Sequence, residues 1–112
     1  MENEARKYLF DMLEAIESIE RFTQDKTQDQ YRDDPLLRSA VERQFQIIGE
    51  ALQQLIKKFP EAGSVITDHR NIINFRNILV HGYDRVESDV VWGIVTGSLP
   101  ALRRQVEKLL RR

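Results

Sequence analysis

The sequence contains no cysteine, and its 112 residues include only three prolines and five glycines. Without thiols the chain has neither disulfide bonds nor thiolate catalysis, which is typical of proteins of the reducing cytoplasm. Long apolar runs are missing as well: none approaches the ~20 residues that span a bilayer, and residues 1–7 lack the apolar core of a signal peptide. We therefore expect a soluble cytoplasmic protein with no membrane association.

The composition fits one modest domain. With 41% hydrophobic and 31% charged residues, the chain is long enough for a single core, so we expect one domain over residues 1–112. The net charge is only −1, but residues 1–20 carry six acids, whereas residues 101–112 carry five basic residues against Glu107 alone. A basic C-terminal helix could guide RNA phosphates, and it could equally be a solvated helix face.

Apolar residues recur at steps of three and four, and no useful length of chain alternates with period two. The pattern predicts a first helix over residues 4–22, followed by a loop or frayed extension over the polar residues 23–30. Asp34 and Pro35 offer an N-cap and a first helical position for a second helix that runs to about Phe59. Its apolar stripe is wider than one neighbour normally covers, so it should contact two helices or a second subunit.

Three further helices are expected after the second. Thr67 or Asp68 can cap the third helix, and Ser88 can cap the fourth. Pro100 fits the start of a fifth helix better than the interior of a longer one. The fold class is therefore all-α, an antiparallel bundle of four to five helices.

The third helix ends in the stretch Arg-Asn-Ile-Leu-Val-His-Gly-Tyr, residues 76–83. Imidazole exchanges protons near neutral pH, and guanidinium holds a phosphate in a two-pronged grip, so Arg76 and His81 together suggest phosphodiester chemistry. Gly82 is expected to act as a left-handed cap, with unpaired carbonyls favouring protonated His81. Five residues of separation place Arg76 and His81 about 140° apart on an ideal helix, so they do not automatically point at one spot.

This stretch resembles the signature of the HEPN superfamily, and within it the HepT-like ribonuclease toxins encoded beside minimal nucleotidyltransferase (MNT) antitoxins. The matching residues are Arg76, Asn77, His81 and Tyr83. Similarity extends over most of the chain from about Leu37 onward. Two flanking stretches also match the family, Ala40-Val41-Glu42-Arg43 with Ile47-Ile48-Gly49-Glu50-Ala51, and Asp89-Val90-Val91-Trp92 with Leu99-Pro100.

The resemblance implies a homodimeric, metal-independent endoribonuclease that needs no cofactor, the toxin of a type VII HEPN/MNT toxin–antitoxin system. Motifs from two protomers would meet in one cleft. His81 would shuttle protons as the 2′-hydroxyl attacks the adjacent phosphate, Arg76 would stabilise the developing charge, and Asn77 would orient the phosphate or the imidazole. The products would be a 2′,3′-cyclic phosphate and a 5′-hydroxyl. Tyr83 would receive AMP from the nucleotidyltransferase, which would block the cleft and repel RNA.

Structural roles are open for the same residues. Arg76 could form an ion pair with Glu42 or Glu50 on the second helix and hold the motif in place. Asn77 could be a capping or interhelical hydrogen bonder, and Tyr83 could pack its ring at the edge of the bundle.

Three other side chains are expected to have structural roles and no part in RNA cleavage. His69 should be a surface or helix-start residue, and Phe75 and Trp92 should belong to the core or an interface. Two histidines without carboxylates at ligand spacing predict no metal site.

Two other functions stay open at the level of sequence. The first is a non-catalytic module that presents a nucleotide or substrate to a nucleotidyltransferase partner. The second is a purely structural helical dimer, suggested by the wide apolar stripe of the second helix. RNA cleavage by the purified protein separates the enzyme from both.

Overall fold

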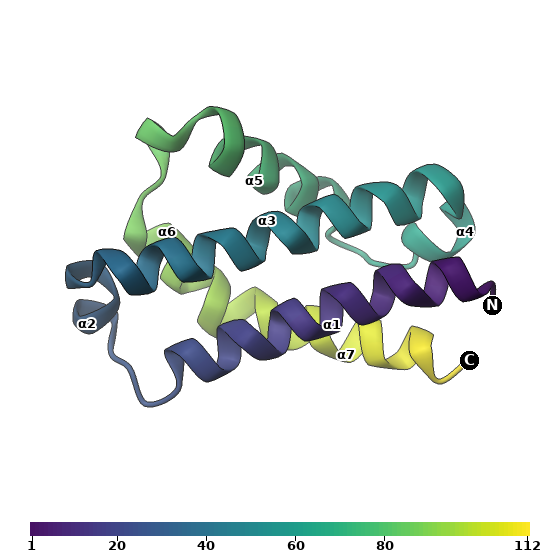
Figure 1. Cartoon of the computed structure of the whole chain (residues 1–112), viewed down its shortest axis with the longest axis horizontal. Helices are drawn as coiled ribbons and strands as arrows, with labels where there is room; N and C mark the ends of the chain where they lie inside the picture. Colours follow the sequence, from purple (N-terminus) through teal and green to yellow (C-terminus); the bar gives the residue numbers. More distant parts are fainter.

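Two long helices, α1 (Asn3–Thr23) and α3 (Pro35–Lys58), form the centre of this computed structural model (Figure 1). The structure describes residues 1–112 except the side chain of Tyr83. The two helices run antiparallel, and the first is confirmed within one residue at each end of the predicted 4–22. Its buried face carries residues at steps of three, four and seven: Ala5, Leu9, Met12, Ala15, Ile16 and Ile19.

Helix α3 begins as predicted. The Asp34 carboxylate accepts a hydrogen bond from the backbone N–H of Leu37, and Pro35 occupies the first turn, where its missing N–H has no helical partner to lose. The wide apolar stripe of α3 contacts α1 on one side and α5 on another, which confirms the expectation of two neighbouring helices. Its buried residues are Leu37, Val41, Phe45, Ile48, Gly49, Ala51, Leu52 and Leu55.

The polar stretch after α1 contains a short helix, α2 (Gln28–Asp33), so the loop predicted over residues 23–30 is partly wrong. A reciprocal capping box starts this helix. The Thr27 hydroxyl accepts from the Gln30 N–H at 3.1 Å, and the Gln30 side chain accepts from the Thr27 N–H at 2.8 Å. Tyr31 then anchors the helix, because it is fully buried and lies 5.5 Å from the Trp92 ring between centroids.

A short turn of helix, α4 (Pro60–Gly63), reverses the chain and leads to α5 (His69–His81). Helix α5 runs antiparallel to α3 and packs mainly on it (Figure 1). Only Leu79 of α5 is fully buried, while Ile72 and Phe75 are partly buried against the core. The third predicted helix is therefore confirmed, and it buries few apolar side chains against the core.

A fourth and a fifth helix are present, and Pro100 lies in the first turn of the fifth as predicted, but an unpredicted π-helical turn joins the two into one continuous run. Helix α6 (Ser88–Gly93) passes through a π-helical turn (Ile94–Ser98) into α7 (Leu99–Leu110), which packs on α1. The N–H of Leu99 donates to the carbonyl of Ile94, five residues back. Pro100 lies directly after this wide turn. Because proline has no N–H and crowds the carbonyl four residues before it, the π turn lets the run continue.

The start of α6 differs from expectation in a smaller way. Ser88 is the first residue of the helix, and Glu87 holds the cap position without a side-chain capping bond. After α5, a single 3₁₀ turn (Tyr83–Arg85) makes the connection toward α6.

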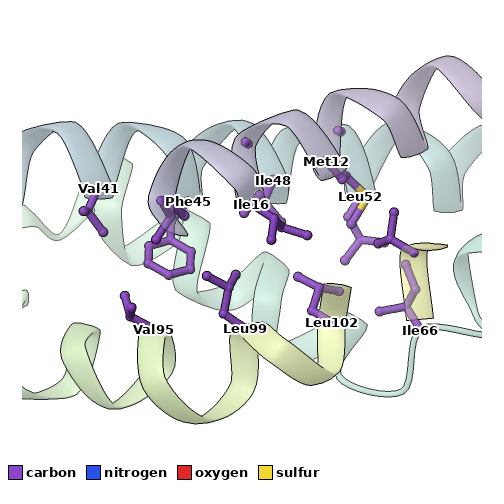
Figure 2. Close-up of a cluster of buried hydrophobic side chains, with 14 of the residues drawn as sticks. Met12, Ile16, Val41, Phe45, Ile48, Leu52, Ile66, Val95, Leu99 and Leu102 are labelled. Carbon is purple, nitrogen blue, oxygen red and sulfur yellow. The ribbon is translucent and has the colours of Figure 1, made fainter. Parts of the chain in front are cut away.

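The core lies between α1, α3 and the last helical run, and Figure 2 shows side chains of all three meeting there. The all-α fold class is confirmed, and the described residues contain no strand. No helix in the described part of the chain is both long and apolar enough to cross a membrane. The residues labelled in Figure 2 are Met12, Ile16, Val41, Phe45, Ile48, Leu52, Ile66, Val95, Leu99 and Leu102.

Candidate active site

Helix α5 carries Arg76, Asn77 and His81 in its last two turns and ends at Gly82. The predicted left-handed conformation of Gly82 is wrong, since its φ is −124°. Its N–H donates to the Ile78 carbonyl at 2.8 Å, and the chain turns at once into Tyr83–Arg85. A Cβ at this position would lie 2.7 Å from a guanidinium nitrogen of Arg85, the movable end of a flexible side chain, so neither space nor φ requires glycine here.

Arg76 is fixed by a close crossing of two helices. A Cβ added to the buried Gly49 of α3 would lie only 2.3 Å from the Cβ of Arg76 and 3.6 Å from the Ile72 carbonyl. The two backbones therefore approach closely because Gly49 has no side chain. As a result, only 21% of the Arg76 side chain is exposed. Sequence reasoning missed Gly49, although a glycine inside a strong helical pattern was a signal of such an approach.

The guanidinium of Arg76 has two polar neighbours. Its Nη2 lies 3.6 Å from Oε1 of Glu50, and its Nη1 donates to Oδ1 of Asn77 at 3.1 Å. Its Nε is buried and has no hydrogen-bond partner among the described side chains. The predicted ion pair with Glu50 is thus confirmed, and Asn77 contacts the arginine directly.

Glu42, the other predicted partner of Arg76, belongs to a different cluster. Burial raises the pKa of the Glu42 carboxyl, and the positive charge of Arg38 acts in the opposite direction. Burial also raises the pKa of Tyr31, with a further contribution from Glu42. Glu42 therefore belongs to the surroundings of α2.

His81 is the last residue of α5, and its side chain is exposed. Arg76 faces α3, whereas His81 faces solvent, and no hydrogen bond or ion pair joins the two among the described contacts. One protomer therefore presents the two groups on one helix without bringing them together. This agrees with the wide angle expected from their spacing.

Tyr83 forms part of the 3₁₀ turn directly after this site. Its side chain lies outside the described residues, so its predicted modification stays a prediction.

The remaining aromatic and histidine expectations are confirmed. His69 is the first residue of α5, with its Nδ1 2.8 Å from the Ile66 carbonyl. Phe75 meets Phe45 edge to face at 5.4 Å between centroids, and Trp92 packs on Tyr31. In the part of the chain that the structure describes, no three potential metal ligands cluster together.

A hollow of about 140 Å³ lies beside the first half of α5, away from the motif. It separates α5 from the π turn and α7, and it lacks Arg76, Asn77 and His81 among its lining residues. We interpret it as a packing gap left because α5 rests mainly on α3. Its apolar lining includes Phe45, Ile72, Phe75, Ile94, Leu99 and Leu102.

Part of the basic charge of the C-terminal segment is neutralised by ion pairs within the fold. Arg103 forms ion pairs with Glu17 and Glu20 of α1 and with Glu107 of its own helix. The C-terminus also lies at the end of the bundle opposite to the end of α5 (Figure 1). Within one protomer, the terminal basic residues are therefore remote from His81.

Comparison with known proteins decides the family. Residues 12–109 match the profile of the family described as "Ribonuclease HepT-like". The chain belongs to the HepT-like ribonuclease family. The resemblance to this family inferred from Arg76, Asn77, His81 and Tyr83 is thereby confirmed, and the family's name supports ribonuclease as the class of activity.

Named relatives agree with this HepT-like assignment. A Thermococcus cleftensis protein named "Probable ribonuclease HepT" is 34% identical over 97% of this chain and 98% of its own length. A Methanocaldococcus jannaschii protein named "Gamma-glutamylcyclotransferase and putative RNase" is 34% identical over 98% of this chain. The chain spans about half of that second protein, 49%. No solved structure gives a significant match.

Proposed function

We propose that this HepT-like chain is a metal-independent endoribonuclease whose active site is completed across a homodimer. One observation carries the proposal: α5 presents a guanidinium held by α3 and, at its end, an exposed imidazole. These are the two groups that RNA transesterification needs, a cation for the phosphate oxygens and a proton carrier.

The proposed reaction uses the RNA's own 2′-hydroxyl. His81 accepts the proton of that hydroxyl as its oxygen forms a bond to the adjacent phosphorus. The bond from phosphorus to the 5′-oxygen breaks, and an imidazolium returns a proton to the leaving oxygen. Arg76 stabilises the negative charge on the phosphoryl oxygens, and Asn77 orients the Arg76 guanidinium. The products are a 2′,3′-cyclic phosphate and a 5′-hydroxyl.

Dimerisation is proposed because one protomer separates the two groups. Arg76 is held against α3 and His81 is exposed at the end of α5, and from their helical spacing we infer that a phosphate held by Arg76 is out of reach of His81 of the same chain. In a two-fold dimer, each copy of α5 would face the other across the axis. His81 of one protomer would then act on a phosphate held by its partner.

We further propose that the enzyme is the toxin of a HEPN/MNT pair and that the nucleotidyltransferase antitoxin adds AMP to Tyr83. Tyr83 follows His81 by two residues. A bulky anionic nucleotide at that position would occupy the site and repel RNA phosphates.

Replacing His81 tests the catalytic proposal. We expect His81→Ala to reduce RNA cleavage by at least about a hundredfold, since positioned proton transfer commonly contributes that much. The protein should remain folded, because the side chain is exposed. His69→Ala, at the other end of α5, is the matched control and should cleave normally. Undiminished cleavage by His81→Ala would refute the assignment.

Modification of Tyr83 is tested by co-expression with the nucleotidyltransferase of a HEPN/MNT pair. We expect the intact mass to rise by one or more AMP units and ribonuclease activity to fall. Tyr83→Phe should keep its unmodified mass, because it lacks the acceptor oxygen. An equal mass gain in Tyr83→Phe would place the modification elsewhere.

A further inference from the structure

A second arginine shares the carboxylate that holds Arg76. Arg43 lies on α3, seven residues before Glu50 and therefore on nearly the same helix face. Its Nη1 lies 3.7 Å from Oε1 of Glu50, the same oxygen that is 3.6 Å from Nη2 of Arg76. Guanidinium groups from two helices thus converge on one carboxylate oxygen.

Both ion pairs are loose. Their distances exceed the 2.7–2.9 Å typical of charged hydrogen bonds. Exposure is graded across the cluster: 21% for the Arg76 side chain, 42% for Glu50 and 58% for Arg43. Water reaches the carboxylate and the outer arginine, so each pair is worth little and an incoming anion can displace Glu50.

The cluster also carries a net positive charge. Two guanidinium groups face a single carboxylate, and the side chains that they hydrogen-bond among the described residues, Gln46 and Asn77, are neutral. Among the described side chains, Arg43 donates one hydrogen bond, to Gln46, and Arg76 donates one, to Asn77. Several guanidinium donors therefore stay available for phosphate oxygens, which arginine binds in bidentate fashion.

We propose that Arg43 is a second phosphate-binding residue of the ribonuclease and that Glu50 is a positioning residue for both arginines. Glu50 sets the two guanidinium groups so that they receive neighbouring phosphates of one RNA strand, Arg76 the scissile one and Arg43 an adjacent one. The RNA phosphates then displace the Glu50 carboxylate from both guanidinium groups. This proposal rests on the proposed function, because it assigns further residues to that site.

Binding tests Arg43 without requiring catalysis. The titration uses single-stranded RNA followed by fluorescence anisotropy, with His81→Ala protein as the parent so that the RNA is not cut. Adding Arg43→Ala should weaken binding about tenfold, as expected for loss of a charged hydrogen-bonding group. The slope of log affinity against log salt should become shallower by about 0.7, the value for one phosphate contact on a single strand.

Arg111→Ala is the matched control, since Arg111 is an exposed arginine next to the C-terminus, at the other end of the bundle. It should leave both affinity and salt slope unchanged. Equal affinity in the Arg43→Ala and Arg111→Ala proteins would overturn the role of Arg43. The result does not depend on cleavage, so it is distinguishable from failure of the proposed reaction.

Glu50→Gln tests positioning, because it keeps the shape of the side chain and removes its charge. Without a competing carboxylate, RNA binding should tighten about threefold. With His81 intact, kcat should fall about tenfold, because the two guanidinium groups are no longer set when RNA arrives and more of the RNA binds in nonproductive positions. A residue that only stabilised the fold would weaken binding when replaced, so weaker binding by a folded Glu50→Gln protein would overturn the proposal.

Discussion

Gly49 determines how closely α5 approaches α3. A side chain at this position would occupy the space of the Arg76 Cβ, and the arginine would lose its place beside Glu50. A small change on α3 therefore reaches the candidate site through packing alone. The position of Arg76 therefore depends on a residue that has no side chain.

We expect Gly49→Ala to lower the free energy of unfolding by about 1–3 kcal/mol, the usual cost of overpacking a tight contact. RNA cleavage should fall as well. Gly93→Ala is the matched control, because nothing lies within 4 Å of a Cβ at that exposed helical position. It should gain up to about 1 kcal/mol from helix propensity. Urea unfolding measures both, and equal stability of the two variants would contradict the packing argument.

Side-chain chemistry singled out Arg76 and His81 from sequence as candidate catalytic residues. Their types and spacing suggested phosphodiester cleavage, and helix geometry already indicated that they diverge. The choice between Glu42 and Glu50 was not predictable, because both follow the same helical pattern. Only the crossing of α3 and α5 decides which carboxylate meets the arginine.

Helix ends divide into those with a side-chain cap and those without one. Asp34 caps α3 through the Leu37 N–H, whereas Asp68, in the same position before α5, makes no such bond. The long central helix is therefore fixed at its start, and the helix that carries the motif is not. Sequence alone offered Asp34 as the cap of α3 and either Thr67 or Asp68 as the cap of α5, and it did not reveal which caps form a bond.

Asp34→Ala should destabilise the protein by about 1 kcal/mol, the typical value of an N-cap bond. Asp68→Ala, the matched control, should change stability by less than about 0.5 kcal/mol, because it breaks no capping bond. Thermal unfolding followed by circular dichroism compares the two. A larger loss for Asp68→Ala would show that a contact other than capping dominates.

Two elements escaped prediction for identifiable reasons. Helix α2 depends on a capping box and on one buried side chain, Tyr31, so it carries too few apolar residues to show a period. The π turn was not predicted because Pro100 follows it, and a proline normally marks the start of a separate helix. In both cases local hydrogen bonding decides the structure, and apolar periodicity does not report on it.

The bundle as a whole supplies a stable frame and leaves the motif at one exposed end. The fold class and the positions of α1, α3 and α5 followed from periodicity, since burial of a stripe dictates them. The assembly that would complete the site depends on surface shape, which the sequence does not display. A dimer with a shared cleft therefore stays a prediction.

Mixing two inactive variants tests that shared cleft. Arg76→Ala and His81→Ala proteins should each cleave RNA at least about a hundredfold more slowly than the parent. After subunit exchange, mixed dimers bring an intact arginine and an intact histidine from different chains together, so part of the activity should return. If the mixture stays as inactive as its components, each site lies within one protomer.

The small buried contact of α5 affects how readily this helix opens locally. With Leu79 as its only fully buried side chain and no side-chain cap at its start, α5 needs less free energy to detach than α1 or α3. The amide protons of α5 should exchange with water through local opening. Those of α1 and α3 should exchange only through global unfolding. We therefore expect the helix that carries the candidate site to be the least protected of the long helices.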